Sequence, residues 1–244
     1  MRRALAVLIL ALAVPAVALA GSDREILSVR YDAPTTRYAH GVLGDAVEWG
    51  ALVLKVDTCP ACALLKAKTI RITLPDTRVF EDLEPRLVDL DNDGRPEVVV
   101  VESDVRLGAA LAVYDESGKI AQTPHIGRTN RWLAPLGAAD LDGDGKVELA
   151  YIDRPHLAKT LRIWRFDGGK LVHLADKPGL TNHKIGEDFI SGGIRDCGTG
   201  PEIVTASGDW ARVMVTTYRG GKVASRDAGP FKGSKSLSDA VACK

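Results

Sequence analysis

Two short acidic segments in the middle of the chain constrain its structure more than any other feature. They span Asp89–Glu97 and Asp140–Glu148, and each places aspartates at positions 1, 3 and 5, a glycine at position 6 and a glutamate at position 9. Four carboxylates so close together repel one another unless a cation lies between them. Ca²⁺ prefers six to eight oxygen ligands, and the glycine permits the sharp turn of such a loop. The segments are therefore predicted to be cation-binding loops rather than solvated acidic turns.

The residues after each loop predict strands rather than helices. A similar acidic spacing occurs in EF-hands, where a bidentate glutamate at position 12 and a helix follow. Position 12 here is Val100 in the first segment and Tyr151 in the second. The chain continues as the apolar runs Val98–Val101 and Leu149–Ile152, which are typical of buried β-strands. The pattern therefore disfavours an EF-hand and predicts strand-loop-strand units.

The sequence repeats with a period of about fifty residues. The two loop-closing glutamates lie 51 residues apart, and similar glutamates lie 49 residues earlier and 54 residues later, which makes the series Glu48, Glu97, Glu148 and Glu202. A second marker recurs at intervals of 51 and 52 residues as the pairs Gly118-Lys119, Gly169-Lys170 and Gly221-Lys222. Each pair follows a strand-like stretch and predicts a tight hairpin turn. Four similar units are therefore expected.

The third unit shows the expected arrangement most clearly. Its predicted strands are Leu136–Ala139, Glu148–Ile152, Thr160–Phe166 and Lys170–Ala175. Four antiparallel strands per unit, with little helical periodicity, predict an all-β fold: a β-propeller of about four blades, with room for part of a fifth. The segment Glu25–Arg30 is expected to complete the last blade, so that the ring closes without an open edge.

The two strand-loop-strand segments, Leu87–Val100 and Ala138–Ala150, resemble the FG-GAP repeat, also called the VCBS repeat, of integrin α-chain propellers and many secreted bacterial proteins. The resemblance implies a β-propeller that binds calcium between the first and second strands of its blades. Proteins of this kind serve adhesion, ligand binding or scaffolding. The implied ligands of about two Ca²⁺ ions are Asp89, Asp91, Asp93 and Glu97 with the carbonyl of Arg95, and Asp140, Asp142, Asp144 and Glu148 with the carbonyl of Lys146. Ligand number and loop flexibility favour Ca²⁺ over Mg²⁺ and leave Mn²⁺ open.

The first and fourth units depart from this pattern. The fourth has Asp196–Glu202 at the place of the loop, with a single aspartate besides its glutamate, and the first has the shortened segment Leu43–Glu48. Neither is expected to hold calcium well, because too few oxygen ligands remain. Integrin propellers also need more residues than this chain has, so the number of blades and the closure of the ring stay open.

The first twenty residues are typical of a secretory signal peptide. Arg2 and Arg3 precede an apolar run, and the small residues Ala18-Leu19-Ala20 end it, so cleavage is expected after Ala20. The run is short for a membrane span, and no later apolar stretch approaches spanning length. The sequence therefore predicts a secreted or periplasmic propeller domain at residues 21–244 with no membrane span in the mature chain.

Charge disfavours a nucleic-acid partner. The chain has 32 basic and 32 acidic residues, and removal of residues 1–20 takes away two arginines and no acid, which leaves a formal charge of −2. Nucleic-acid-binding domains carry an excess of positive charge. The expected ligand is instead a protein or a polysaccharide, whose identity the sequence does not reveal.

Four cysteines in an exported protein predict disulfides. Cys59 and Cys62 form a C-x-x-C motif in an insertion expected between the second and third strands of the first unit, and Cys197 and Cys243 remain as the other candidate pair. A C-x-x-C motif also occurs in thiol-disulfide active sites, which need a following helix to lower the thiol pKa. The stretch Ala63–Lys68 could make barely two helical turns, so a structural disulfide is favoured over redox chemistry.

Other catalytic signals are few. The five histidines stand singly, and the chain has no H-E-x-x-H or G-x-S-x-G motif. We therefore expect a binding, adhesion or scaffold module rather than an enzyme. Two alternatives stay open: a propeller hydrolase or lyase that acts on an extracellular polymer, and an exported thiol-disulfide protein that uses Cys59 and Cys62.

Aromatic and basic residues alternate in three connecting segments. Thr36–Tyr38 and Asn130–Trp132 are expected just ahead of the first strands of their units, and His183-Lys184 lies near the matching place in the fourth. Such connections gather at one face of a propeller, where ligands bind. The simpler interpretation, which we favour, is that the rings pack between blades while their basic neighbours are solvated.

Overall fold

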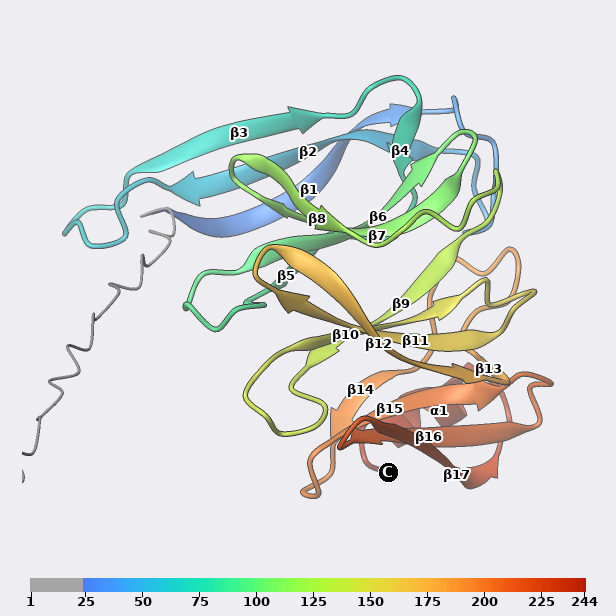
Figure 1. Ribbon diagram of the computed structural model, residues 1–244. Helices are drawn as coiled ribbons and strands as arrows, with labels where there is room; N and C mark the ends of the chain where they lie inside the picture. The colour runs from blue at the N-terminus through green and yellow to red at the C-terminus, as the bar shows by residue number, and fades with distance from the viewer. Residues whose placement is uncertain (1–23) are drawn as a thin grey trace, which may run out of the picture.

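The computed structural model describes residues 24–244, which form seventeen β-strands and one α-helix. The strands make antiparallel sheets that are stacked on one another, from β1 at one end of the molecule to β17 at the other (Figure 1). The fold is therefore all-β, as the sequence predicts. The predicted signal peptide, residues 1–20, lies outside the described residues. Among the residues described, no helix is both long and apolar enough to cross a membrane.

Four consecutive units make up this part of the chain. The first contains β1 (Glu25–Thr35), β2 (Glu48–Asp57) and β3 (Ala67–Thr73). The second contains β4 (Arg78–Phe80), β5 (Arg86–Val88), β6 (Glu97–Asp104), β7 (Gly108–Asp115) and β8 (Gly118–Gln122). The third contains β9 (Leu133–Ala139), β10 (Glu148–Asp153), β11 (Thr160–Asp167) and β12 (Lys170–Pro178). The fourth contains β13 (Leu180–Thr181), β14 (Gly193–Asp196), β15 (Pro201–Ser207), β16 (Arg212–Arg219), β17 (Lys222–Pro230) and the helix α1 (Ser234–Val241).

The third unit matches the predicted strand pattern most closely. Its strands lie in the order β12-β11-β10-β9, and all neighbours are antiparallel. The turn between β11 and β12 contains Gly168 and Gly169, whose φ angles of 57° and 74° lie in the left-handed region that favours glycine. The other two Gly-Lys pairs lie at the matching turns, between β7 and β8 and between β16 and β17. The predicted hairpins are therefore confirmed.

The first unit differs from the prediction. Glu25–Arg30 does not complete the last unit, because β1 pairs with β2 along its length, from Glu25 opposite Asp57 to Thr35 opposite Glu48. The first unit also has three strands rather than four, and β4 joins it to the second unit by pairing with both β2 and β6. Pairing with the next strand along the chain needs only a short connection, which costs less entropy than bringing two distant segments together.

The hydrophobic core lies between successive sheets. Each residue of the predicted buried run Val98–Val101 is at most 3% exposed. One core cluster joins the second and third units and includes Val101 and Tyr151, and another joins the third and fourth units and includes Ile163 and Ile203. Strands that are buried on both faces are continuous apolar runs in the sequence. This is why polar and apolar residues do not alternate in these segments.

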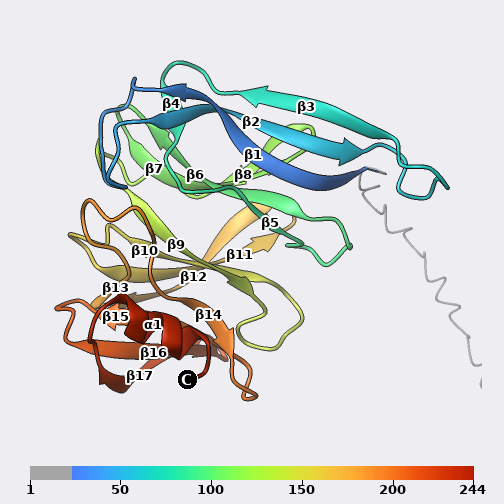
Figure 2. The same ribbon diagram turned by 180° about the vertical axis from the view of Figure 1, so that it is seen from behind.

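Helix α1 is a feature that the sequence analysis did not predict. It packs Leu237 and Ala240 against β15 and β16 on the far side of the fourth unit, as the view from behind shows (Figure 2). The helix has only eight residues. Its apolar positions are too few to stand out as a helical period in the sequence.

Candidate cation sites

Both acidic loops lie at the same corner of their units. Residues 89–97 join β5 to β6, and residues 140–148 join β9 to β10. In each unit the glutamate begins the strand after the loop and pairs with the last residue of the strand before it. The predicted strand-loop-strand arrangement is confirmed, since a strand rather than a helix follows each loop.

Backbone amides hold the first loop in shape. The carboxylate of Asp89 accepts hydrogen bonds from the N–H groups of Asp93 (3.1 Å) and Gly94 (3.0 Å). At the other end of the loop, Glu97 Oε2 accepts a hydrogen bond from the N–H of Leu90 (2.8 Å). These bonds bring carboxylate oxygens of Asp89, Asp91 and Glu97 within 4.8 Å of one another. Three oxygens so placed could hold a metal ion.

The second loop repeats this geometry. Asp140 accepts hydrogen bonds from the N–H groups of Asp144 (3.1 Å) and Gly145 (2.9 Å), and Glu148 Oε2 accepts one from the N–H of Leu141 (2.8 Å). Carboxylate oxygens of Asp140, Asp142 and Glu148 again lie within 4.8 Å of one another. Because the same residues make the same bonds in both loops, the local sequence determines how the carboxylates are grouped.

The aspartates at position 5 stand apart from these groups. Asp93 Oδ1 accepts a hydrogen bond from the N–H of Arg95 (2.8 Å), and Asp144 Oδ1 accepts one from the N–H of Lys146 (2.9 Å). The structure therefore brings together the carboxylates at positions 1, 3 and 9. The roles of position 5 and of the position-7 carbonyls as ligands stay predictions.

An arginine from the neighbouring strand contacts the second loop. Arg165 on β11 lies 2.5 Å from Glu148 Oε1, 2.8 Å from Asp144 Oδ2 and 3.3 Å from Asp142 Oδ2. Its place is fixed by register, because Arg165 pairs with Glu148 across β10 and β11. The guanidinium thus supplies a resident positive charge to this loop.

The first loop has a different neighbour at the corresponding position. In its unit Val98 pairs with Tyr114, so the residue opposite Glu97 on β7 is Asp115. The depression beside this loop has a volume of about 150 Å³, and its charged lining residues are Asp91, Asp93, Glu97, Asp115 and Glu116 together with Arg24 and Arg95. The neighbouring strand therefore adds a carboxylate to the first loop and a guanidinium to the second.

The pKa values of the two glutamates reflect this difference. Burial raises the pKa of Glu97 to about 7, and the nearby Asp91 and Asp93 contribute to the rise. Burial also raises the pKa of Glu148, but there hydrogen bonding and charge attraction from Arg165 oppose the rise. Burial disfavours the charged form of both carboxyl groups, and a dication bound beside them would favour it.

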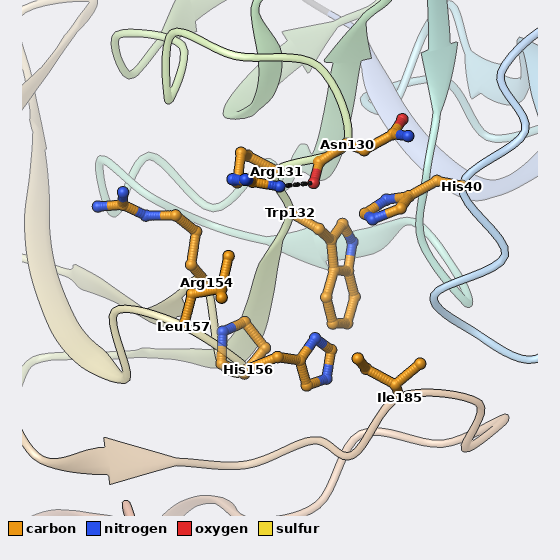
Figure 3. A pocket seen from close by; sticks show the side chains of 9 residues that line it. His40, Asn130, Arg131, Trp132, Arg154, His156, Leu157 and Ile185 are labelled. Carbon is orange, nitrogen blue, oxygen red and sulfur yellow. Dashed lines mark hydrogen bonds between the residues drawn. The ribbon is translucent and has the colours of Figure 1, made fainter.

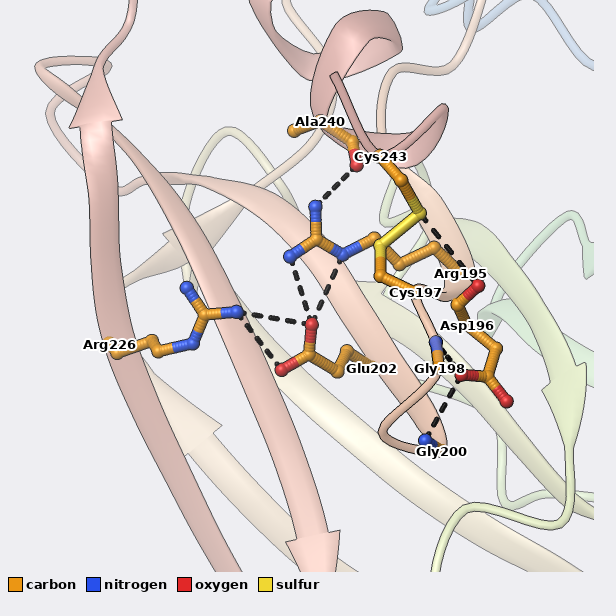
Figure 4. The surroundings of a disulfide bond; sticks show 9 residues. All are labelled: Arg195, Asp196, Cys197, Gly198, Gly200, Glu202, Arg226, Ala240 and Cys243. Carbon is orange, nitrogen blue, oxygen red and sulfur yellow. Dashed lines mark hydrogen bonds and ion pairs between the residues drawn. A yellow bond between two sulfur atoms is a disulfide. The ribbon is translucent and has the colours of Figure 1, made fainter.

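The fourth corner is neutralised by two arginines (Figure 4). Glu202 Oε2 accepts hydrogen bonds from Arg195 Nε (3.1 Å) and Nη2 (2.9 Å), and Arg226 Nη2 lies 3.1 Å from both carboxylate oxygens. Burial alone would raise the pKa of Glu202, but these hydrogen bonds lower it overall. The Cys197–Cys243 disulfide ties the same loop to the end of α1. Among the described residues this corner holds no group of three carboxylates that could bind a metal ion, and its poor calcium binding stays a prediction.

The first corner has neither an aspartate loop nor an arginine. Glu48 begins β2 and is 3% exposed, and no basic side chain of residues 24–244 lies within ion-pair distance of it. Burial, with the nearby Glu81 and Asp45, raises the pKa of Glu48 to about 9. At neutral pH this glutamate is therefore held as the uncharged acid.

Both candidate disulfides are present, as Cys59–Cys62 and Cys197–Cys243. The first lies in the connection between β2 and β3, as predicted. The residues that follow Cys62 form turns and bends rather than a helix. A redox role for the C-x-x-C motif therefore lacks the helix that would lower a thiol pKa.

The aromatic connecting segments gather at the opposite edge of the sheets. Tyr38 Oη accepts a hydrogen bond from the N–H of Asn130 (2.8 Å), and the rings of Trp132 and His183 meet edge to face with centroids 4.9 Å apart. All three rings are at most 3% exposed, so they pack between units as we favoured. The first segment follows β1 rather than preceding the first strand, because β1 itself is the first strand of its unit.

Two histidine contacts at this edge were missed by the sequence analysis. His40 Nδ1 lies 2.5 Å from Glu81 Oε1, and His156 Nε2 lies 3.0 Å from His183 Nδ1. The partners are 41 and 27 residues apart in the chain. No local motif connects residues at such separations, so the sequence contains no signal for either pair.

Comparisons with known proteins add to these observations. The model of the FG-GAP-like repeat family matches residues 89–151, the stretch that contains both acidic loops. The chain contains an FG-GAP-like repeat. No curated protein matches the chain. Among solved structures, a rhamnogalacturonan lyase of Bacillus licheniformis (PL11) is similar over 87% of this chain, with 14% sequence identity and a TM-score of 0.42. The match covers 50% of the lyase, so this chain spans about half of its length.

Proposed function

We propose that residues 21–244 form a secreted or periplasmic β-propeller-like module that binds Ca²⁺ and acts in binding, adhesion or scaffolding. One observation carries the proposal: two consecutive units group three carboxylates at the same corner, within 4.8 Å of one another. The FG-GAP-like repeat at this place and the stacked antiparallel units support it. Two disulfides support an oxidising compartment.

The carboxylate oxygens at the Glu97 and Glu148 corners suit a hard dication, but the charges around the two corners differ. At the Glu97 corner, burial and the nearby Asp91 and Asp93 raise the pKa of Glu97, so a dication there relieves repulsion. At the Glu148 corner a dication competes with Arg165 for Glu148 and Asp142. The Glu97 corner is therefore the tighter site in this proposal. Bound ions would rigidify the loops, while the residues around them do no chemistry.

Calorimetric titration of the purified mature protein with CaCl₂ tests the proposal directly. We expect uptake of up to two ions, and a fall in Tm when EGTA removes them, because a ligand that binds only the folded form stabilises it by about 2.7 kcal/mol at a hundredfold excess over Kd. MgCl₂ at the same concentration serves as the control for non-specific charge screening. Absence of calcium uptake together with an unchanged Tm in EGTA would refute the proposal.

A second candidate function, a hydrolase or lyase that acts on an extracellular polymer, is favoured by one observation. The His40–Glu81 pair borders a pocket far from the acidic loops, and a histidine held by a carboxylate is suited to acid-base chemistry. Incubation of the protein with extracellular polysaccharides, followed by measurement of new reducing ends, tests this function. If the protein shows activity and His40→Ala abolishes it, the enzyme function is supported over the binding function.

A further inference from the structure

A pocket of about 310 Å³ lies at the edge of the sheets opposite the acidic loops. Figure 3 shows the side chains that line it. Its lining comes from separate connections: Arg131 precedes β9, Arg154 follows β10, and His40 and Ile185 come from the first and fourth units. Since β9 and β10 run from this pocket to the loop at residues 140–148, the two places are about 20 Å apart. The pocket is thus separate from the proposed cation sites.

Two guanidinium groups border the pocket, and none of its nine lining residues is acidic. Arg154 donates through Nε (2.8 Å) and Nη2 (3.0 Å) to Asp153, which orients the group and leaves Nη1 without a bond to that carboxylate. Arg131 donates through Nη1 to the carbonyl of Asn130 (2.9 Å), and no carboxylate among residues 24–244 lies within ion-pair distance of it. A half-buried guanidinium without a carboxylate partner attracts an anion from solution.

Hydrogen bonds assign an acceptor on the opposite wall. His183 Nε2 donates to the carbonyl of Glu187 (3.0 Å), so His183 Nδ1 is an acceptor. His156 Nε2 therefore donates to His183 Nδ1 (3.0 Å), which leaves His156 Nδ1 as a lone-pair acceptor. Burial lowers the pKa of His156 to about 4, so this ring is neutral at pH 7. It can accept a hydrogen bond from a ligand hydroxyl.

A further ring nitrogen comes from the first unit. His40 uses Nδ1 on Glu81 Oε1, so Nε2 is the nitrogen left for a ligand. At the rim, Leu157 and Ile185 are 63% and 74% exposed. Large aliphatic side chains beside convergent polar groups are typical of ligand sites.

We propose that this pocket binds a small oxyanion: a molecule about the size of one sugar ring, with a carboxylate or phosphate group and at least one hydroxyl. Arg131 and Arg154 hold the anionic group, and His40 Nε2 lies on the wall that the first unit supplies. His156 accepts from the hydroxyl, while Leu157 and Ile185 cover the apolar side. The volume of about 310 Å³ lies at the lower end of the range for ligand pockets, which limits the ligand to this size.

Titration with matched probes tests the proposal. D-glucuronate and D-glucose 6-phosphate carry the two anionic groups on one sugar ring, and D-glucose is the uncharged control. Binding is measured by calorimetry and by saturation-transfer NMR, with EGTA present so that the result does not depend on the proposed calcium sites. We expect at least one anionic probe to bind about tenfold or more tightly than glucose, because charge-assisted hydrogen bonds are lost with the anion. Preference for one probe identifies the carboxylate or the phosphate as the recognised group.

Variants locate the binding. Arg131→Gln is expected to lower the affinity for the preferred probe about tenfold. An unchanged Tm shows that the variant is folded. The matched control is Arg128→Gln, which alters an exposed arginine of the same connection that does not line the pocket. Arg154→Gln is a second variant, and it keeps the test decisive if Arg131→Gln misfolds. Equal binding of glucose and the anionic probes, no binding by any probe at millimolar concentration, or the same loss in the Arg128 variant would overturn the proposal.

Discussion

At residues 89–97 and at residues 140–148 the chain builds the same loop twice. In both, an aspartate at position 1 and a glutamate at position 9 hold matching backbone amides. The loops differ on the adjacent strand, where β7 places Asp115 beside the first and β11 places Arg165 beside the second. The motif thus determines the arrangement of the carboxylates, while the neighbouring strand determines the charge around them.

The outer two units extend the comparison. In the fourth unit the corresponding glutamate is Glu202, and two arginines lower its pKa. In the first unit it is Glu48, which is buried without an ion pair, and its pKa rises to about 9. The same glutamate is therefore neutralised differently in each unit. Glu48 holds a proton, and Glu97 is proposed to bind a cation. Glu148 contacts an arginine that a cation must displace, and Glu202 contacts two arginines.

We expect the greatest loss from Asp89→Asn, which removes one charge from the first loop and one of the two oxygens that accept its backbone amides. Calcium affinity at that corner should fall about 100-fold, or about 2.8 kcal/mol, because a position-1 carboxylate is a ligand and the amide is a weaker one. Calorimetric titration measures the change. The matched variant Asp140→Asn should lose less, since Arg165 already offsets the second loop. Equal losses at the two corners would contradict the proposed difference.

Glu48→Gln tests the proton at the first corner. The folded pKa of about 9 lies above the ordinary value of 4.5, so the folded protein holds a proton that the unfolded chain releases. Stability should therefore be greatest below about pH 4.5 and fall as the pH rises to about 9. The glutamine variant should lose this slope and be several kcal/mol more stable than the parent at pH 9, about 1.4 kcal/mol for each pKa unit of the difference, with little difference at pH 4.

Urea unfolding across this pH range measures the Glu48 effect. Asp76→Asn is the control, because Asp76 is a fully exposed acid of the turn between β3 and β4 and does not contribute to the pKa of Glu48. If the parent and the Glu48→Gln variant show the same pH dependence, Glu48 does not hold the proton.

Arg165→Gln should make the Glu148 corner resemble the Glu97 corner. Without the guanidinium, calcium affinity there is expected to rise about tenfold, or about 1.4 kcal/mol. The metal-free protein should at the same time lose about 1 kcal/mol of stability, since the buried Glu148 keeps only the N–H of Leu141 as a partner. Calorimetry and urea unfolding in EGTA measure the two effects. Arg162→Gln is the control, because Arg162 lies on the same strand but pairs with Asp153 and Asp176. Unchanged calcium affinity in the Arg165 variant would show that the arginine does not compete.

Glu202→Gln should leave calcium uptake unchanged. Arg195 and Arg226 retain an amide oxygen as a partner, so the cost is expected to be about 1 kcal/mol of stability, equal with and without EGTA. Urea unfolding in both conditions provides the measurement. A drop in calcium stoichiometry would reveal a third cation site that the arginines do not explain.

Much of the fold follows from local sequence. The apolar runs, the Gly-Lys turns and the acidic loops each depend on residues close together in the chain, and the third unit has nearly the predicted strands. The prediction failed where a choice between partners was needed. Glu25–Arg30 was expected to pair with the last unit, yet β1 pairs with β2, because strand propensity says nothing about which edge a strand joins.

The sequence by itself determined the period of the units, the grouping of Asp89, Asp91 and Glu97, and the placing of Cys59 and Cys62 between two strands. Only the tertiary structure decided that Arg165 reaches one loop while Asp115 lies beside the other, and that His40, Arg131 and Arg154 meet in one pocket. The physical reason is the range of the interactions. Turns and loops are set by hydrogen bonds within a few residues, whereas the charge around a site depends on strand register and on the packing of units far apart in the chain.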